Sequence, residues 1–179
     1  RREFAFQKFR NAKIHQHLPF SETTLAEALK AHGYRTAIFG KWHLGEDPSG
    51  PAAHGFDVQV PTLWRKGWPR RGYHAPFQME GIPGKQGDYL TDRLTDEVIK
   101  SLERSHDRPF FTFLSYFTPH RPTQAKEEFI RKYEAKLSPD QVQRNPVNAG
   151  MIHSLDENVG RLMQSLDDLN LADNTLLIF

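Results

Sequence analysis

The sequence of 179 residues contains no cysteine. It therefore offers no disulfide framework, no thiolate metal site and no cysteine nucleophile. It also has no uninterrupted apolar run near the roughly 18 residues that a transmembrane helix requires, so we expect no membrane span. These absences exclude a disulfide-stabilised scaffold and a helical membrane protein for this stretch of chain.

The chain has little excess charge of either sign. Its 24 Lys and Arg residues are nearly balanced by 22 Asp and Glu residues, which leaves a formal net charge of +2. A chain that binds nucleic acid through a polycationic tail would be far more basic, so we expect no nucleic-acid partner. Hydrophobic residues make up 37% of the sequence, enough for one core and about one domain.

The first regular elements are predicted between residues 24 and 39. Thr24 and Glu27 have the spacing of a capping box, which begins a helix, and Gly33 suits the left-handed residue that ends one. The apolar run Tyr34–Phe39 follows and is typical of a buried strand. This segment is therefore predicted to form a helix followed by a strand.

Helical and strand patterns alternate again after residue 88. Leu90, Leu94, Val98 and Leu102 share one helical face, and the nearly continuous apolar run Phe110–Phe117 predicts a strand covered on both faces. A second apolar stripe runs from Met151 to Leu169 and leads into a last predicted strand, Thr175–Phe179. The alternation predicts an α/β fold with a mostly parallel sheet and crossover helices.

Two features concern the organisation of the chain. Residues 45–87 are rich in glycine and proline, which predicts a long irregular insertion with a functional role near a ligand cleft. The apolar run at Thr175–Phe179 would leave a core strand at the end of the chain, where an exposed edge promotes aggregation. We therefore expect residues 1–179 to be an internal piece of a larger domain, incomplete at both ends.

Polar side chains follow two of the predicted strands, where ligands bind in an open parallel sheet. Lys41 and His43 come directly after the first strand, and His120 lies between two prolines after the next. A lysine supplies a permanent positive charge, and histidines can give or take a proton near neutral pH. This combination suits group transfer at a sulfuryl or phosphoryl centre. The residues alone also allow a solvated loop and a histidine that only bonds a carbonyl.

The amino-acid sequences of these loops resemble those of the type I sulfatases, which are formylglycine-dependent, arylsulfatase-like members of the alkaline phosphatase superfamily. Residues 33–45, Gly-Tyr-Arg-Thr-Ala-Ile-Phe-Gly-Lys-Trp-His-Leu-Gly, are similar to the second signature of that family. Further similar stretches occur in the same order, at 54–57, 89–92, 109–111, 119–122, 156–160 and 173–175. The resemblance implies an alkaline-phosphatase-like α/β fold and identifies residues 1–179 as part of a sulfatase catalytic domain that hydrolyses sulfate esters.

The resemblance also implies roles for three residues. Lys41 would bind the sulfate near the nucleophile, and His43 would orient or deprotonate the formylglycine hydroxyl and help to eliminate sulfate. His120 would bind a sulfate oxygen and protonate the leaving alcohol. The resemblance further implies a periplasmic or secreted enzyme that acts on a small-molecule or oligosaccharide sulfate ester.

Other family motifs are missing from these residues. The Cys/Ser-x-Pro-Ser-Arg nucleophile motif, the paired aspartates and the Asp-Asn pair that hold calcium do not occur in the expected places. We therefore expect the formylglycine and the calcium ligands to lie outside this chain, and we assign no metal ligand within it. These 179 residues alone are predicted to be inactive.

The segment Trp64–His74 interleaves aromatic and basic residues. Such a segment can stack on bases and contact phosphates, but in a sulfatase it would more naturally line the mouth of the cleft. There Arg65, Arg70 and Arg71 would bind neighbouring sulfates of the substrate. The alternative is a surface loop held in place by its tryptophans.

Two other functions remain compatible with the sequence. The cations of the predicted pocket would also suit a phosphodiester or phosphonate-ester hydrolase of the same superfamily. A catalytically inactive module that binds anions or glycans is the second alternative. Two histidines outside the predicted pocket, His54 and His153, are expected to be surface or packing residues.

Overall fold

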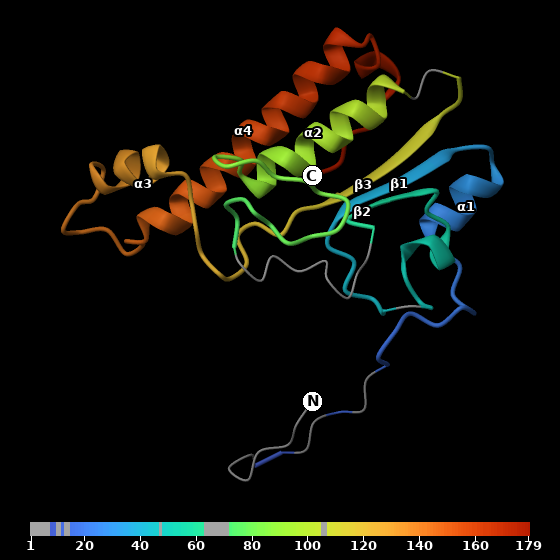
Figure 1. Ribbon diagram of the computed structural model, residues 1–179, viewed down its shortest axis with the longest axis horizontal. Coiled ribbons are helices and arrows are strands. Elements are labelled where there is room, and N and C mark those ends of the chain that lie inside the picture. Colours follow the sequence, from blue (N-terminus) through green and yellow to red (C-terminus); the bar gives the residue numbers. More distant parts are fainter. Residues whose placement is uncertain (1–7, 10–11, 13–14, 47, 63–71, 105–106) are drawn as a thin grey trace.

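The computed structural model describes the chain except residues 1–7, 10–11, 13–14, 47, 63–71 and 105–106. Its sheet has three parallel strands in the order β2-β1-β3 (Figure 1). These strands are β1 Arg35–Gly40, β2 Val58–Val60 and β3 Phe110–Ser115. The parallel pairing confirms the predicted α/β class with crossover connections.

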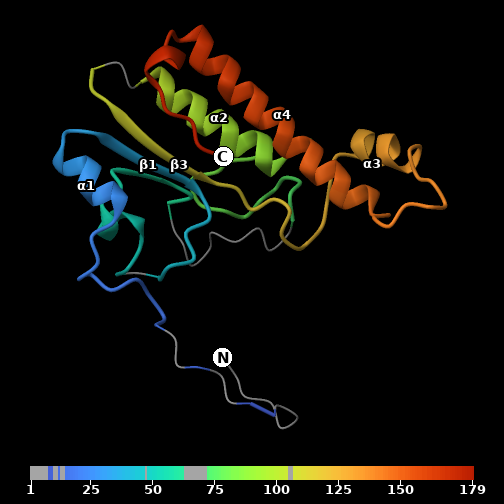
Figure 2. The same cartoon turned by 180° about the vertical axis from the view of Figure 1, so that it is seen from behind.

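Helices cover the sheet on both sides. The helices are α1 Leu25–Ala31, α2 Leu90–Glu103, α3 Glu127–Glu134 and α4 Pro146–Asp168, and short 3₁₀ segments occur at Pro51–His54 and Ala172–Asn174. Seen from the front and from behind, α2 and α4 lie side by side along one side of the sheet, whereas α1 lies apart from them beside β1 (Figures 1 and 2). No helix in the described part of the chain is long and apolar enough to cross a membrane.

The start of α1 forms as the sequence predicts. The Thr24 hydroxyl accepts a hydrogen bond from the Glu27 amide at 3.1 Å, and the Glu27 carboxylate accepts one from the Thr24 amide at 2.7 Å. This capping box satisfies two amides that the first helical turn leaves without partners. Gly33 follows the helix with a φ of +82°, the left-handed conformation expected of a glycine there.

The core lies on both faces of β1, whose side chains alternate between them. Ala37 and Phe39 pack against the apolar faces of α2 and α4, whereas Ile38 packs against Trp42 and Phe56 on the other face. This double burial explains the continuous apolar run, because a strand in a parallel sheet is covered on both sides. The predicted stripe Leu90, Leu94, Val98 and Leu102 of α2 is also buried.

Two elements were not predicted. Residues 45–87 were expected to be irregular, but they contain β2, which pairs with β1 through Val58 and Val60. A three-residue strand is too short to show a period and forms because β1 offers it a partner. Helix α3 was missed because it is only eight residues long, with Phe129 buried and Ile130 partly buried against the core, which is too few apolar positions to show a helical period.

Two strand predictions need correction. Residues 175–179 form no strand: the side chains of Leu176, Ile178 and Phe179 are more than 80% exposed, and no described strand pairs with them. An apolar run becomes a strand only where a neighbouring backbone accepts its hydrogen bonds. In addition, β3 is not covered on both faces along its length, because the Phe113 side chain is 45% exposed.

An ion pair ties α1 to the loop that precedes β2. The Asp57 carboxylate lies 2.6 Å from the Lys30 ammonium, and its other oxygen accepts a hydrogen bond from the Thr36 amide of β1. Partial burial opposes the charge on Asp57, but Lys30 and the Thr36 amide outweigh this effect, and the pKa of Asp57 lies below its ordinary value. The charged form is therefore the one that stabilises the fold.

We expect Asp57→Asn to lower the free energy of unfolding by roughly 1–2 kcal/mol at neutral pH, since it removes a charge-assisted pair. Because the folded pKa is lowered, this contribution is complete above the unfolded pKa of about 3.9 and is lost as the pH falls through the folded pKa. Urea unfolding of wild type and variant over this pH range measures the difference. A difference that does not shrink in acid would contradict the assignment.

Candidate functional site

The carboxyl ends of β1 and β3 meet at one edge of the sheet. The two strands pair in register from Arg35 opposite Phe110 to Gly40 opposite Ser115, and the Lys41 amide then donates a hydrogen bond to the Ser115 carbonyl at 2.7 Å. Lys41 is thus fixed by its backbone at the point where both strands end. The two strands that precede Lys41 and His120 in the sequence are therefore neighbours in the sheet.

Gly40 permits this close approach of the two strands. It has a φ of +95°, and a Cβ atom at this position would lie 1.9 Å from the Ser115 carbonyl oxygen. Every other residue would therefore have to push the strands apart while adopting an unfavourable left-handed backbone. The glycine immediately before Lys41 is consequently a structural requirement of the site.

Trp42 fixes the loop that carries Lys41 and His43. Its indole Nε1 donates a hydrogen bond to the Ser49 carbonyl at 3.0 Å, and the ring is 8% exposed and packs edge-on against Phe56. His43 is exposed and has a φ of +60°, which is uncommon for a residue with a side chain. Backbone conformations of this kind gather at functional sites, where the surrounding structure holds them in place.

The loop after β3 is held by two buried tyrosines. The Tyr73 hydroxyl donates a hydrogen bond to the His120 carbonyl at 3.0 Å, and the Tyr89 hydroxyl donates one to the Gln124 carbonyl at 2.8 Å. A buried contact at 2.7 Å between the hydroxyls of Thr91 and Thr118 adds a third connection. Burial raises the pKa of Tyr73 to about 12, so its hydroxyl stays protonated and able to donate at neutral pH.

The His120 side chain is exposed and has a defined tautomer. Its Nδ1 lies 2.8 Å from the Arg121 carbonyl oxygen, which can only accept a hydrogen bond. Nδ1 therefore carries a proton, and Nε2 is the atom that takes up or gives a proton when the ring changes charge.

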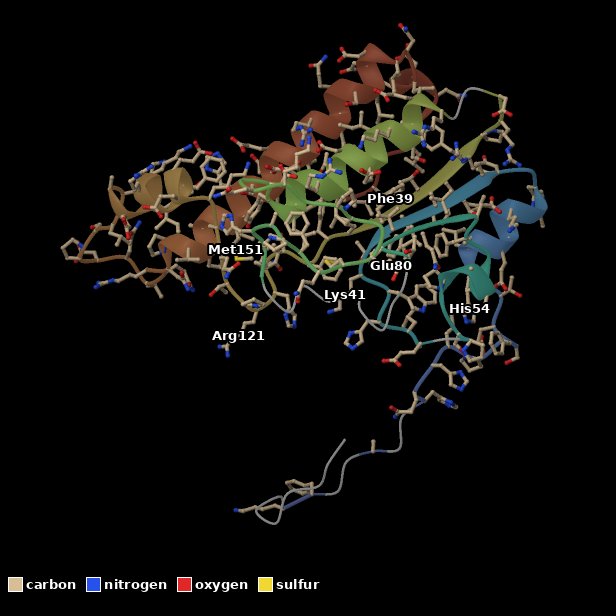
Figure 3. The ribbon with its side chains drawn as sticks, viewed as in Figure 1. Phe39, Lys41, His54, Glu80, Arg121 and Met151 are labelled. Atoms are coloured by element: carbon tan, nitrogen blue, oxygen red, sulfur yellow. The ribbon has the colours of Figure 1, made fainter. Side chains whose placement is uncertain are left out.

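The structure places the three predicted catalytic residues, Lys41, His43 and His120, relative to the strands of the sheet. Half-buried Lys41 and exposed His43 lie at the end of β1, and His120 lies in the loop that follows the paired strand β3. Figure 3 shows Lys41 and Arg121, the neighbour of His120, below the sheet in this view, with Phe39 above them and His54 toward α1. The predicted substrate-binding residues Arg65, Arg70 and Arg71 lie outside the described residues.

The described residues do not fit a resident metal ion. They bring together no group of three His, Cys, Asp or Glu side chains that could hold one. The family resemblance assigns the calcium ligands to other motifs, and no step proposed below passes through calcium.

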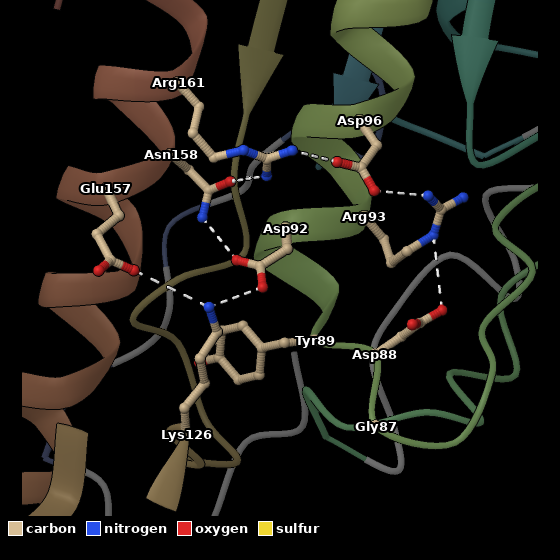
Figure 4. Close-up of a pocket in the computed structure, with 10 residues that line it drawn as sticks. All are labelled: Gly87, Asp88, Tyr89, Asp92, Arg93, Asp96, Lys126, Glu157, Asn158 and Arg161. Carbon is tan, nitrogen blue, oxygen red and sulfur yellow. Dashed lines mark hydrogen bonds and ion pairs between the residues drawn. The ribbon is translucent and has the colours of Figure 1, made fainter. Parts of the chain in front are cut away.

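One feature that the sequence analysis missed is an open hollow of about 400 Å³ between α2 and α4 (Figure 4). The Asp92 carboxylate accepts hydrogen bonds there from Lys126 at 2.8 Å and from Asn158 at 2.7 Å, and Asp96 pairs with Arg93 and Arg161. Partial burial opposes the charge on Asp96, but the two guanidinium groups outweigh it and lower the pKa of this carboxyl. The network connects α2 to α4, because Asp92 bonds to Asn158 and Asp96 pairs with Arg161.

Part of this network was visible in the sequence. Arg93 and Glu97 have the i,i+4 spacing of a helical ion pair, and they do pair at 2.8 Å. The contacts between helices were not visible, because they join residues about 65 positions apart, as Asp96 and Arg161 are. No periodicity in one helix indicates which charged residue of another helix will face it.

The relationship of this chain to known proteins follows from its match to a protein-family model. The model described as Sulfatase matches residues 3–179. The chain belongs to the sulfatase family. This membership agrees with the strand-end architecture described above and with the resemblance drawn from residues 33–45.

Several members of the family are similar over most of this chain. An uncharacterized sulfatase of Escherichia coli, YdeN, is 27% identical over 97% of the chain and 35% of its own length. Human N-acetylgalactosamine-6-sulfatase is 30% identical over 90% of the chain and 32% of its own length. The chain therefore spans about a third of the length of these curated relatives.

The fold of the sulfatase chain is also found among solved structures. The crystal structure of Ps i-CgsB in complex with k-i-k-neocarrahexaose superimposes with a TM-score of 0.68 at 26% identity. The match covers 93% of this chain and 40% of that one. The α/β arrangement described here is therefore that of an experimentally determined relative.

Proposed function

We propose that this chain is one wall of the active site of a longer enzyme that hydrolyses sulfate esters. The observation that carries the proposal is the parallel register of β1 and β3, which ends both strands at one edge and fixes Lys41 against Ser115. A cation and two histidines that follow those strand ends suit a tetrahedral anion. Family membership supports sulfate as that anion.

The three side chains would divide the work of the reaction. The Lys41 ammonium would bind a sulfate oxygen and stabilise the negative charge that grows in the transition state. Attack at sulfur by an oxygen nucleophile from another part of the protein forms one S–O bond and breaks the S–O bond to the alcohol. A proton from Nε2 of the charged His120 ring goes to the departing alcohol oxygen. His43 would hold or remove a proton at the oxygen of the nucleophile.

The protonation geometry of His120 supports its role as the acid. Because Nδ1 donates to the Arg121 carbonyl, Nε2 is the nitrogen that would exchange the proton with the substrate. The hydrogen bond from Tyr73 to the His120 carbonyl holds the backbone of this residue in place. A general acid depends on such fixed placement, since proton transfer needs hydrogen-bond distance to the leaving oxygen.

Discrimination between sulfate and phosphate tests this proposal. We expect the purified full-length protein to turn over nitrophenyl sulfate with a kcat/KM at least about tenfold above that for bis(nitrophenyl) phosphate, a phosphodiester, or for a phenylphosphonate ester. A preference for either phosphorus ester would favour a phosphodiester or phosphonate-ester hydrolase. Glycan binding without turnover of any ester would indicate an inactive binding module.

We further propose a sulfated carbohydrate as substrate and a periplasmic or secreted location. A solved relative holds a carrageenan-type oligosaccharide, and a relative at 30% identity is named for a sulfated aminosugar. The basic residues Arg65, Arg70 and Arg71 would contact neighbouring sulfates of such a chain. Their side chains lie outside the described residues, so this role depends on the sequence alone.

The double variant Arg70→Ala/Arg71→Ala measures the role of these arginines. In the full-length protein we expect KM for a polysulfated oligosaccharide to rise about tenfold, with little change in KM for nitrophenyl sulfate, because only the larger substrate reaches them. Steady-state kinetics with both substrates gives the comparison. Equal changes for the two substrates would rule out a role in binding the extended chain.

A further inference from the structure

His54 is a buried histidine with unusual surroundings. Its side chain is fully buried, and neither ring nitrogen has a hydrogen-bond partner among the described residues. Buried polar side chains are hydrogen-bonded in the large majority of cases, so an imidazole without partners requires an explanation. The sequence analysis expected only a surface or packing residue at this position.

Two aromatic rings pack against His54, and one of them connects it to the candidate site. The Phe20 ring stacks on the imidazole, with ring centroids 5.3 Å apart and an interplanar angle of 11°. The centroid of the Trp42 ring lies 5.6 Å from that of the imidazole. Trp42 is the residue between Lys41 and His43. His54 therefore contacts the loop of the candidate site directly, through the Trp42 side chain.

The backbone around His54 is fixed more firmly than its ring. The Thr24 hydroxyl donates a hydrogen bond to the His54 carbonyl at 2.8 Å, and His54 ends the 3₁₀ segment that begins at Pro51. Among the described residues, the ring nitrogens make no hydrogen bond, and the ring packs against the aromatic rings of Phe20 and Trp42. A change in the charge of the ring would consequently alter its contact with Trp42 without breaking the local backbone structure.

Two titratable groups face this cluster. The first is Glu27 of α1, whose pKa is lowered chiefly by the hydrogen bond from the Thr24 amide and also by the nearby His54 ring. The second is His17, whose ring lies 6.4 Å from Phe20 at the outer end of the cluster.

We propose that neutral His54 is a positioning residue that holds the Lys41–His43 loop through Trp42, and that protonation of His54 releases this loop. Neither ring nitrogen of His54 has an acceptor among the described residues, so the second N–H of a protonated ring would stay unpaired in the packed arrangement. The effect of release on catalysis rests on the proposed function. The coupling between His54 and the loop does not.

Amide hydrogen exchange in the full-length protein tests the coupling without any need for activity. After correction for intrinsic exchange rates, protection of the amides of residues 41–45 should fall about tenfold between about pH 7.5 and pH 5. In His54→Phe, whose ring keeps the packing and carries no charge, the corrected protection should stay constant. His17→Gln is the matched control and should behave as wild type.

The same pH dependence in His54→Phe as in wild type would overturn the proposal, and so would its loss in His17→Gln. Should His54→Phe fail to fold, His54→Gln is also neutral at every pH and should likewise show constant protection. If the protein is active, the kcat of His54→Phe should fall less in acid than that of wild type, with KM unchanged. Absence of turnover would contradict the proposed function and leave the exchange result intact.

Discussion

Replacing Lys41 or His120 by alanine in the full-length protein is expected to lower kcat/KM for nitrophenyl sulfate at least about a hundredfold in each case. Lys41→Ala removes a cation fixed at the end of β1 by the hydrogen bond from its amide to the Ser115 carbonyl. His120→Ala removes the proton donor whose Nδ1 is held by the Arg121 carbonyl. Both losses weaken interactions that are strongest in the transition state, so kcat should fall more than KM changes.

A matched control separates these effects from a general loss of positive charge. Lys100→Ala removes an equally charged side chain on α2, where the ammonium pairs with Glu97 and lies 46% exposed. Its kinetics should equal those of wild type, and thermal unfolding should show that all three variants are folded. Near-normal rates in both Lys41→Ala and His120→Ala would remove these residues from the proposed mechanism.

Gly40→Ala is expected to cause the largest loss of stability, about 4 kcal/mol or more in the free energy of unfolding. The added Cβ would lie 1.9 Å from the Ser115 carbonyl oxygen, and the φ of +95° is unfavourable for alanine. Backbone strain alone costs roughly 1–3 kcal/mol, and the overlap with a backbone atom adds to it because β1 and β3 cannot separate without losing their hydrogen bonds. Urea unfolding measures the change.

Gly33→Ala provides the comparison for this prediction. Gly33 also has a left-handed backbone, with a φ of +82°, but no atom lies within 4 Å of a Cβ placed there. This variant should therefore lose only the conformational part, roughly 1–2 kcal/mol. Equal losses in the two glycine variants would mean that the close approach of β1 to β3 is not what Gly40 provides.

The parts of the fold that the sequence predicted are those that local rules determine. The capping box at Thr24 and Glu27, and the stripe from Leu90 to Leu102, depend on spacing within one helix. The short strand β2 and the helix α3 have no such signal, since they form against partners distant in sequence. The predicted strand Thr175–Phe179 was wrong because apolar composition was counted without a pairing partner.

The candidate site was predictable to the same extent. The topology rule for parallel sheets placed Lys41 and the His120 loop after neighbouring strands, and the register of β1 and β3 confirms that placement of the backbone. The contacts that hold the site were not predictable. The hydrogen bond from Tyr73 to His120 spans 47 positions, and His54 packs against rings from two separate segments, Phe20 and Trp42.

The central claim is that Lys41 and His120 bind one tetrahedral anion together. A crystal structure of the full-length protein grown with sulfate measures this most directly. The account predicts one sulfate with an oxygen near the Lys41 Nζ and another near a ring nitrogen of His120, each about 3 Å away. A sulfate held elsewhere, with these two side chains facing apart, would contradict the account.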